Sequence, residues 1–400
     1  MNKKTLIIIS IIVGVIILII TGYFLFRSED INEPTDDGFF SFFFPTSEDK
    51  LGPESVTGPD GQTTQPSDTT TLPIGKFVQL TDSPISGATF NEETNSIRYF
   101  EKSTGHVYEI EPNGQNKKQI TITTIPKIFE VSWSFDSLMA VLKYVGVENG
   151  QTSNIRNFSV YSMATSSLPG PSEGIFLPSN ISSLAISPNE NKLFYLVGEE
   201  NKQGIIASFE NKKQEEIFST PFGNFITSWP QKNIITLQTK PSAKIQGYLY
   251  KLNPQTELFT KIIGNLAGLT ALYSPLNDTV FYSQSIRNSF QTKILSENKK
   301  ETTELAYKTF PEKCVFSKTD AKIIYCAIPK AIPMANYPDD WYKGLISFED
   351  SLWKIDLNGG PTENMLSENG FDITNLFLSA EEDYIFFQNK KDSTLWSLKI

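Results

Sequence analysis

The chain has few of the residues from which most catalytic and metal sites are built. Its 400 residues include a single histidine, His106, and two cysteines. One histidine excludes a His-rich metal centre and a catalyst that needs paired imidazoles. The chain also has no Walker loop and no G-x-G-x-x-G segment. We therefore expect no cofactor, no metal and no enzyme of these classes, and we expect His106 to be a surface residue.

The chain also lacks an excess of basic charge. It has 35 basic and 45 acidic residues, for a formal net charge of −10. Residues 28–73 hold ten acids against Lys50 alone, whereas residues 74–400 are nearly neutral, with 31 basic and 35 acidic side chains. A nucleic-acid backbone is bound by a concentrated basic surface. Nucleic acid is therefore not an expected partner.

Only one stretch of the chain is uniformly apolar. Residues 5–26 carry no charge and consist mainly of Ile, Leu and Val. Such a run spans roughly 30 Å as a helix, the thickness of a bilayer core. Two lysines precede it, and two acids follow Arg27, so the positive-inside rule puts the N-terminus in the cytoplasm. The run is long for a signal peptide. We predict a single-pass anchor over residues 1–27, in contact with membrane lipid through residues 5–26, and an extracytoplasmic remainder.

Residues 28–73 have the composition of a tether. Half of the 46 positions are Pro, Ser, Thr or Gly. A segment of this kind buries too little apolar surface to offset its ordering entropy, so we expect it to be disordered. Five phenylalanines within Phe39–Phe44 interrupt the pattern. Two roles are open for this cluster: contact with the membrane interface or a partner, and loose packing against the following domain.

From Ile74 to the end, short β runs alternate with turn residues. One motif recurs: an apolar strand end, a Ser-Pro-Asn-like turn and an alternating strand. The copies lie at Ala88–Phe100, Val131–Tyr144, Leu184–Leu196, Thr227–Leu237, Ala271–Ser283, Cys314–Cys326 and Leu376–Gln388. Their turns are spaced by 44, 53, 42, 45, 43 and 62 residues. A period of this length, with four strands per unit, is typical of propeller blades.

We therefore predict an all-β fold: a seven-bladed β-propeller over residues 74–400. Six blades remain an alternative if the first or fourth copy is not a true repeat. The last copy supplies only three strands before the chain stops, and Lys76–Leu80 can supply the fourth. Pairing the two ends would remove the exposed edge of an open ring.

These repeats resemble those of TolB-like and WD40-like bacterial propellers over residues 76–400. The usual Asp-Gly after Ser-Pro is absent from every copy, as is the Trp-Asp ending of eukaryotic WD40 repeats. With its anchor, the chain looks like membrane-anchored envelope proteins of small-genome bacteria. The resemblance implies interaction with other molecules rather than catalysis, and it transfers no catalytic residue.

The two cysteines flank one predicted hairpin. Cys314 and Cys326 are equidistant from Asp320, near the centre of the turn, so they face each other across the strands. Opposed residues lie close enough for a disulfide, and an extracytoplasmic location permits oxidation. We predict the bond Cys314–Cys326, with a structural role. Two reduced, buried thiols are the alternative.

The longest spacing contains an insert, residues 328–350, between the second and third strands of the sixth unit. Aromatic side chains beside acids are typical of a recognition surface. The candidate binding residues are Tyr337, Asp339, Asp340, Trp341, Tyr342 and Lys343. The alternative is a loop that folds back and plugs the central channel with Trp341.

Three functions remain open at this point. The first is a scaffold or ligand-binding module for another envelope protein. The second is a carbohydrate-binding or carbohydrate-cleaving propeller, because two carboxylates suffice for a glycosidase. Its candidate acids are Asp339, Asp340, Glu349 and Asp350. The third is a structural element of the envelope without a dedicated ligand.

Overall fold

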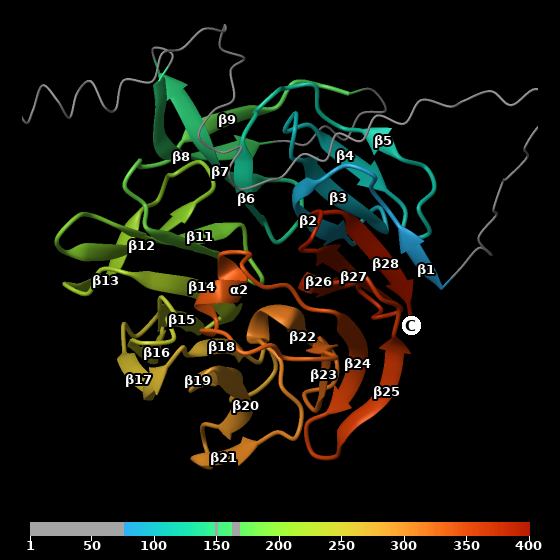
Figure 1. The fold of residues 1–400 in the computed structure, drawn as a ribbon. Coiled ribbons are helices and arrows are strands. Elements are labelled where there is room, and N and C mark those ends of the chain that lie inside the picture. Colours follow the sequence, from blue (N-terminus) through green and yellow to red (C-terminus); the bar gives the residue numbers. More distant parts are fainter. Residues whose placement is uncertain (1–75, 149–150, 162–168) are drawn as a thin grey trace, which may run out of the picture. The chain divides into compact units, whose positions relative to one another are not determined.

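The computed structural model describes residues 76–148, 151–161 and 169–400. The chain divides into the units Met1–Thr69 and Thr70–Ile400, and all described residues belong to the second. Their strands form seven four-stranded antiparallel sheets, one for each repeat copy. The sheets follow one another around a ring (Figure 1). The expected all-β propeller is confirmed.

The first four sheets are formed in chain order. They contain β2 (Ile85–Asn91), β3 (Ser96–Glu101), β4 (Val107–Ile110) and β5 (Lys118–Gln119); β6 (Ile128–Trp133), β7 (Ala140–Glu148), β8 (Gln151–Tyr161) and β9 (Glu173–Phe176); β10 (Ser183–Ile186), β11 (Lys192–Val197), β12 (Lys202–Ser208) and β13 (Glu215–Thr220); and β14 (Phe225–Gln231), β15 (Ile234–Thr239), β16 (Gln246–Leu252) and β17 (Phe259–Ala267).

The last three sheets continue the ring. They contain β18 (Thr270–Tyr273), β19 (Thr279–Ile286), β20 (Ser289–Ser296) and β21 (Glu301–Glu304); β22 (Cys314–Phe316), β23 (Ile323–Pro329), β24 (Asp350–Asp356) and β25 (Gly360–Leu366); and β26 (Ile373–Leu378), β27 (Tyr384–Asn389), β28 (Leu395–Lys399) and β1 (Phe77–Gln79). Two short helices, η2 (Pro311–Lys313) and α2 (Asp339–Tyr342), lie among the described residues.

Each repeat copy forms the first two strands of a sheet, and its serine holds the turn between them. Met139 N–H donates to Ser134 Oγ at 2.8 Å, and Tyr384 N–H donates to Ser379 Oγ at 3.0 Å. The corresponding serines of three other turns are equally buried: Ser187, Ser274 and Ser317. A buried hydroxyl that satisfies turn amides explains why serine recurs at this position.

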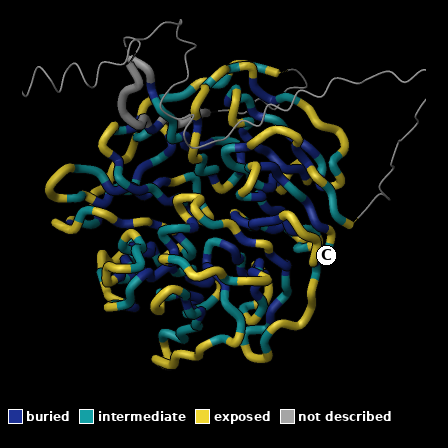
Figure 2. The backbone as a smooth tube through the Cα atoms, in the orientation of Figure 1, coloured by how far each residue is buried: buried dark blue, intermediate teal, exposed yellow. Residues whose placement is uncertain are grey.

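The two ends of the described chain close the ring. β1 pairs with β28, with Phe77 opposite Leu398, and Leu80 N–H donates to the Leu395 carbonyl at 2.8 Å. The expected closing segment, Lys76–Leu80, is confirmed. The core lies between neighbouring sheets rather than at one centre. The cluster that joins the first and seventh sheets, for example, contains Ile97, Tyr99, Phe386 and Leu395. Figure 2 shows buried segments along the strands and exposed segments mainly at turns.

The predicted disulfide is present. Cys314 and Cys326 are direct partners in the β22–β23 pairing, with a Cα–Cα distance of 4.1 Å, and their sulfurs are bonded. Both residues belong to a buried apolar cluster with Phe281 and Ile355. The bond therefore closes a short loop inside the sixth sheet, as the opposed spacing predicted.

Removing this bond is expected to lower the free energy of unfolding by about 3 kcal/mol, because the closed loop reduces the entropy of the unfolded chain. The double variant Cys314→Ala/Cys326→Ala is compared with the parent chain by urea unfolding. Reductant should bring the parent close to the variant and leave the variant unchanged. Equal stabilities of oxidised parent and variant would contradict the prediction.

Within the described residues, no helix has the length and hydrophobicity needed to cross a membrane. The expected anchor over residues 5–26, the linker over 28–73 and the cluster Phe39–Phe44 lie outside the described residues. All three remain predictions.

Candidate functional site

The insert of the sixth sheet connects β23 to β24 and contains α2. In an antiparallel four-stranded sheet, loops between the second and third strands lie on the same side as the connections to the next sheet. We call this side the insert face. It comprises the insert itself (330–349), the loops 240–245, 287–288 and 390–394, and the connections 305–313 and 367–372. Figure 1 shows α2 over the middle of the ring rather than at its rim.

The aromatic side chains of the insert turn inward. Tyr337 is 0% exposed and Trp341 is 2% exposed. The Trp341 ring stacks on Phe310 with a centroid distance of 5.1 Å, and Tyr337 packs edge-on against Phe290 at 4.9 Å. Phe348 completes this buried aromatic cluster. Tyr337 and Trp341 therefore pack the insert against the propeller and offer no exposed ring surface, as in the alternative of a loop that folds back onto the ring.

The two neighbouring acids of α2 anchor the insert. The Asp339 carboxylate accepts hydrogen bonds from Ala243 N–H at 2.6 Å and Ser242 Oγ at 3.1 Å, both in the fourth sheet's loop. Asp340 accepts the Asn336 N–H at 2.7 Å within the insert. Both carboxylates thus already have partners in the protein, and their first role is to hold the loop in place.

The remaining candidate residues reach the surface. Tyr342 is 41% exposed, and its hydroxyl donates to Glu312 Oε1. Lys343 is exposed at the end of α2. The structure thus separates the six predicted residues: two are buried, two anchor the insert, and two lie where another molecule can reach them. A binding role for these residues remains a prediction.

A buried ion network fixes the base of the insert. Lys313 Nζ lies 2.5 Å from Asp350 Oδ2 and 2.5 Å from Asp372 Oδ1, and all three side chains are 0% or nearly 0% exposed. The Lys313 ammonium also lies 5.0 Å from the ring centroids of Trp341 and Phe348. The network joins the connection before the sixth sheet, the end of the insert and the connection before the seventh sheet.

The two carboxylates of this network differ in their surroundings. Burial raises the pKa of Asp350, even though Lys313 attracts its charge. Burial opposes ionisation of Asp372 as well, but the charge of Lys313 and donated hydrogen bonds hold the pKa of Asp372 below its usual value. Trp341 Nε1 and the Phe348 N–H donate to Asp372 at 3.1 and 3.0 Å. Asp372 is therefore the charged anchor of the insert.

The proposed glycosidase acids all have structural partners. Glu349 pairs with Lys391 and accepts the Gly370 N–H, and Asp350 pairs with Lys313. Asp339 and Asp340 hold α2 as described. Among the described residues, no group of three or more His, Cys, Asp or Glu side chains is placed to bind a metal ion. The lone histidine, His106, is partly buried and hydrogen bonds to Thr124 and Gln119.

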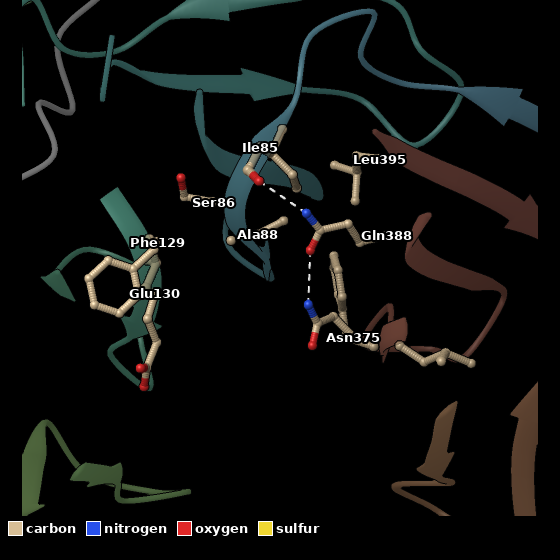
Figure 3. Close-up of a pocket in the computed structure, with 12 residues that line it drawn as sticks. Ile85, Ser86, Ala88, Phe129, Glu130, Asn375, Gln388 and Leu395 are labelled. Atoms are coloured by element: carbon tan, nitrogen blue, oxygen red, sulfur yellow. Dashed lines mark hydrogen bonds between the residues drawn. The ribbon is translucent and has the colours of Figure 1, made fainter. Parts of the chain in front are cut away.

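The insert leaves part of the channel mouth open. Its contacts reach the fourth, fifth and seventh sheets. Across the ring, a cavity of about 340 Å³ lies between the first strands of the first, second and seventh sheets. We call it the channel-mouth pocket. Figure 3 shows its side chains, which come from β2, β6, β26, β27 and β28. Its lining consists of Ile85, Ser86, Gly87, Ala88, Phe129, Glu130, Val131, Asn375, Leu376, Phe377, Gln388 and Leu395.

All three first strands that line this pocket are irregular at the pocket. The pairing register shifts between Ile85 and Gly87 in β2, between Ile128 and Glu130 in β6, and between Thr374 and Phe377 in β26. The extra residues at these shifts, Ser86, Phe129, Asn375 and Leu376, all line the pocket. The first strands β10 and β18 pair without a shift. β-Bulges redirect side chains and are frequent beside functional sites.

Sequence reasoning missed both the ion network and the pocket. Lys313 and Asp372 belong to different repeat units and to no motif, so the sequence does not pair them. A β-bulge changes the sequence pattern by too little to be recognised in such variable repeats. The one available signal was that the copies Ala88–Phe100 and Val131–Tyr144 depart from the Ser-Pro-Asn pattern. Both copies contribute a strand to the pocket.

No protein-family model and no curated protein matches the chain. Solved structures do match. An oligogalacturonate lyase from Vibrio parahaemolyticus is 10% identical with a TM-score of 0.54, over 81% of this chain and 93% of that chain. The β-propeller domain of Cps50 from Myceliophteria thermophila is 9% identical with a TM-score of 0.51, over 81% and 99%. TolB from Acinetobacter baumannii is 11% identical with a TM-score of 0.42, over 70% and 64%. At these identities the first two likenesses establish the fold alone, that of a β-propeller.

Proposed function

We propose that the chain is a non-catalytic, extracytoplasmic binding propeller that is tethered to the cell membrane and recognises a protein partner through its insert face. The tether follows from the apolar run at residues 5–26 and the acidic linker 28–73. The observation that carries the binding role is the exposure of large apolar side chains on a firmly anchored insert. Met334 is 81% exposed and Leu345 is 70% exposed.

The anchoring of the insert makes this exposure informative. A loop that only covered the core would turn its apolar side chains inward, as Trp341 and Tyr337 do. Met334 and Leu345 are instead exposed on the same segment. Ile245, which is 64% exposed, lies on the loop 240–245, which bonds to α2 through Asp339. Apolar side chains that are gathered and held at a surface are typical of protein–protein contact sites.

The direction of β1 is compatible with a partner site on the insert face. β28 begins at the loop 390–394 on the insert face, and β1 runs antiparallel to it. Chain entry at Lys76 therefore lies on the opposite face of the ring. The described chain thus begins on the face opposite the insert.

The alternative of a carbohydrate-binding or carbohydrate-cleaving propeller was motivated by the aromatic and acidic side chains of the insert, Trp341 among them. That ring is buried and its N–H is bonded to Asp372, and the four candidate acids hold the insert in place. We therefore favour a protein partner, and a glycan array with the full chain is the direct check on the carbohydrate alternative.

Site-specific photo-crosslinking tests the proposal. The full chain carries a photoreactive amino acid at Leu345 in source cells, and a matched chain carries it at Leu258. Leu258 is similarly exposed, at 63%, but lies in the hairpin between β16 and β17 on the opposite face. A discrete crosslinked protein from position 345 and none from 258 is expected. Equal labelling at both positions, or none at 345, would overturn the proposal.

A further inference from the structure

Three segments of the insert face are joined by hydrogen bonds, and we call them together the insert sector. They are the residues 240–245, 286–289 and 330–346. The Ala243 N–H donates to the Asp339 carboxylate at 2.6 Å and joins the first segment to the insert. The Ala335 N–H donates to the Asn288 carbonyl at 3.2 Å and joins the second segment to it. Figure 1 shows α2 beside the sheet of β14 and β15, which carries the first segment.

Basic side chains outnumber acids in the insert sector. Its five basic residues are Lys240, Lys244, Arg287, Lys330 and Lys343. Its two acids, Asp339 and Asp340, already accept backbone N–H groups of the protein. None of the five cations forms an ion pair with a carboxylate of the described residues. The sector is therefore positively charged, although residues 74–400 together hold more acids than bases, 35 against 31.

Three of the cations lie next to the hydrogen bonds that join the segments. Lys244 and Arg287 each adjoin a residue that bonds to the insert, and both are exposed. Lys343 is exposed one helical turn after Asp339, and its N–H donates to the Asp339 carbonyl at 3.0 Å. The hydrogen bonds hold the backbone beside each cation in place, so the three charges act on the same part of the insert face.

Exposed apolar side chains accompany these cations. Ile245, Ile286 and Leu345 are all exposed, and each lies within two residues of one of the three cations. Cations favour and accelerate the approach of a negatively charged partner, whereas apolar side chains supply the contact area that is buried on binding. The insert sector offers both kinds of contact at one surface.

We propose that the insert sector binds an acidic segment of the protein partner, whose carboxylates meet Lys244, Arg287 and Lys343 and whose apolar side chains pack on Ile245 and Leu345. This inference rests on the proposed function, because it names the chemistry of the partner at the same face. A nucleic acid would leave the apolar side chains uncovered, and the net charge of −10 opposes its approach.

An anionic bilayer is the other surface that cations and apolar side chains could meet. A flat layer of headgroups would face Asp339 and Asp340 together with Lys343, because all three belong to α2 and its end. Like charges brought together oppose binding. A protein segment can place its carboxylates at the cations alone, so we favour the protein segment.

The molecule that becomes crosslinked at position 345 gives a direct test. The full chain with the photoreactive amino acid at Leu345 is irradiated in source cells, and mass spectrometry identifies the peptide that is attached to it. A peptide with more Asp and Glu than Lys and Arg is expected. A neutral or basic peptide, or an adduct with the mass of a lipid, would overturn the inference.

Charge reversal tests the three cations themselves. The triple variant Lys244→Glu/Arg287→Glu/Lys343→Glu should lower the crosslinking yield at position 345 by about ten-fold, because attraction to the acidic segment becomes repulsion. All three side chains are exposed, so the variant should keep its fold, and far-UV circular dichroism checks this. An unchanged yield in the folded variant would refute the assignment.

The triple variant Lys212→Glu/Lys299→Glu/Lys322→Glu is the matched control. It makes the same change in net charge with exposed lysines, which lie in turns on the face opposite the insert. Its crosslinking yield at position 345 should equal that of the parent chain. An equal loss of yield in both variants would show that only the net charge of the chain matters, and it would also refute the assignment.

The failure of this inference can be told from the failure of the proposed function. A discrete protein crosslinked at Leu345 through a basic peptide, or with a yield that ignores the charge reversal, would leave the proposed partner face standing and remove only the acidic segment. The absence of any crosslinked protein at Leu345 would remove the proposed partner face and the acidic segment together.

Discussion

Replacing Lys313 by methionine is expected to destabilise the propeller by about 3–5 kcal/mol, because two buried carboxylates would lose the ammonium group that pairs with both. Methionine keeps most of the volume of the side chain, so the change removes the charge rather than the packing. Asp350 and Asp372 would then face each other in a site from which solvent is excluded. Urea unfolding followed by far-UV circular dichroism measures the loss.

Two further variants sharpen this test. Lys343→Met lies on the same insert but is exposed, and it should shift stability by no more than about 0.5 kcal/mol. The triple variant Lys313→Met/Asp350→Asn/Asp372→Asn should recover part of the loss, because no buried charge is left unpaired. A single Lys313→Met variant as stable as the parent chain would show that this ion network does not hold the sixth and seventh sheets together.

Trp341→Ala is expected to cost about 3–5 kcal/mol, because the ring fills a closed aromatic cluster and donates its N–H to Asp372. The effect should appear in the free energy of unfolding, whether or not a partner is present. A residue that served only for recognition would leave that free energy unchanged when it is truncated.

Tyr342→Ala is the matched control for this variant. Tyr342 is the next residue of α2 and is 41% exposed, so its truncation should cost clearly less than that of Trp341. Equal stability losses would mean that the insert is held by α2 as a whole rather than by the buried indole. The double variant Lys313→Met/Trp341→Ala should be less destabilised than the sum of the single variants, because the two side chains are in contact.

The local sequence pattern was sufficient to predict the strands and the turns. The serine turns at Ser134 and Ser379 were predictable because a hydroxyl that bonds its own turn is a short-range device, complete within a few residues. The same holds for Cys314 and Cys326, whose equal distance from one turn places them opposite each other. Closure through Lys76–Leu80 could be predicted because only one strand was missing from the last unit.

The insert shows what a sequence pattern cannot predict. Its sequence predicts aromatic and acidic side chains in one loop, but not which of them face inward. Trp341 is buried because Phe310, Lys313 and Asp372 converge on it from two different inter-sheet connections. An aromatic residue in a long loop has the same local signature in a recognition surface and in a buried anchor.

By itself the sequence determined the all-β repeat, the closing strand and the cysteine pairing, because alternation, turn chemistry and spacing act over a few residues. Only the tertiary structure decided the ion network and the channel-mouth pocket. Lys313 meets carboxylates 37 and 59 residues away, and Gln388 bonds to Ile85 across 303 residues. Closing the ring brings the first and last sheets together, and the burial and pairing of a charge depend on which distant segments meet there.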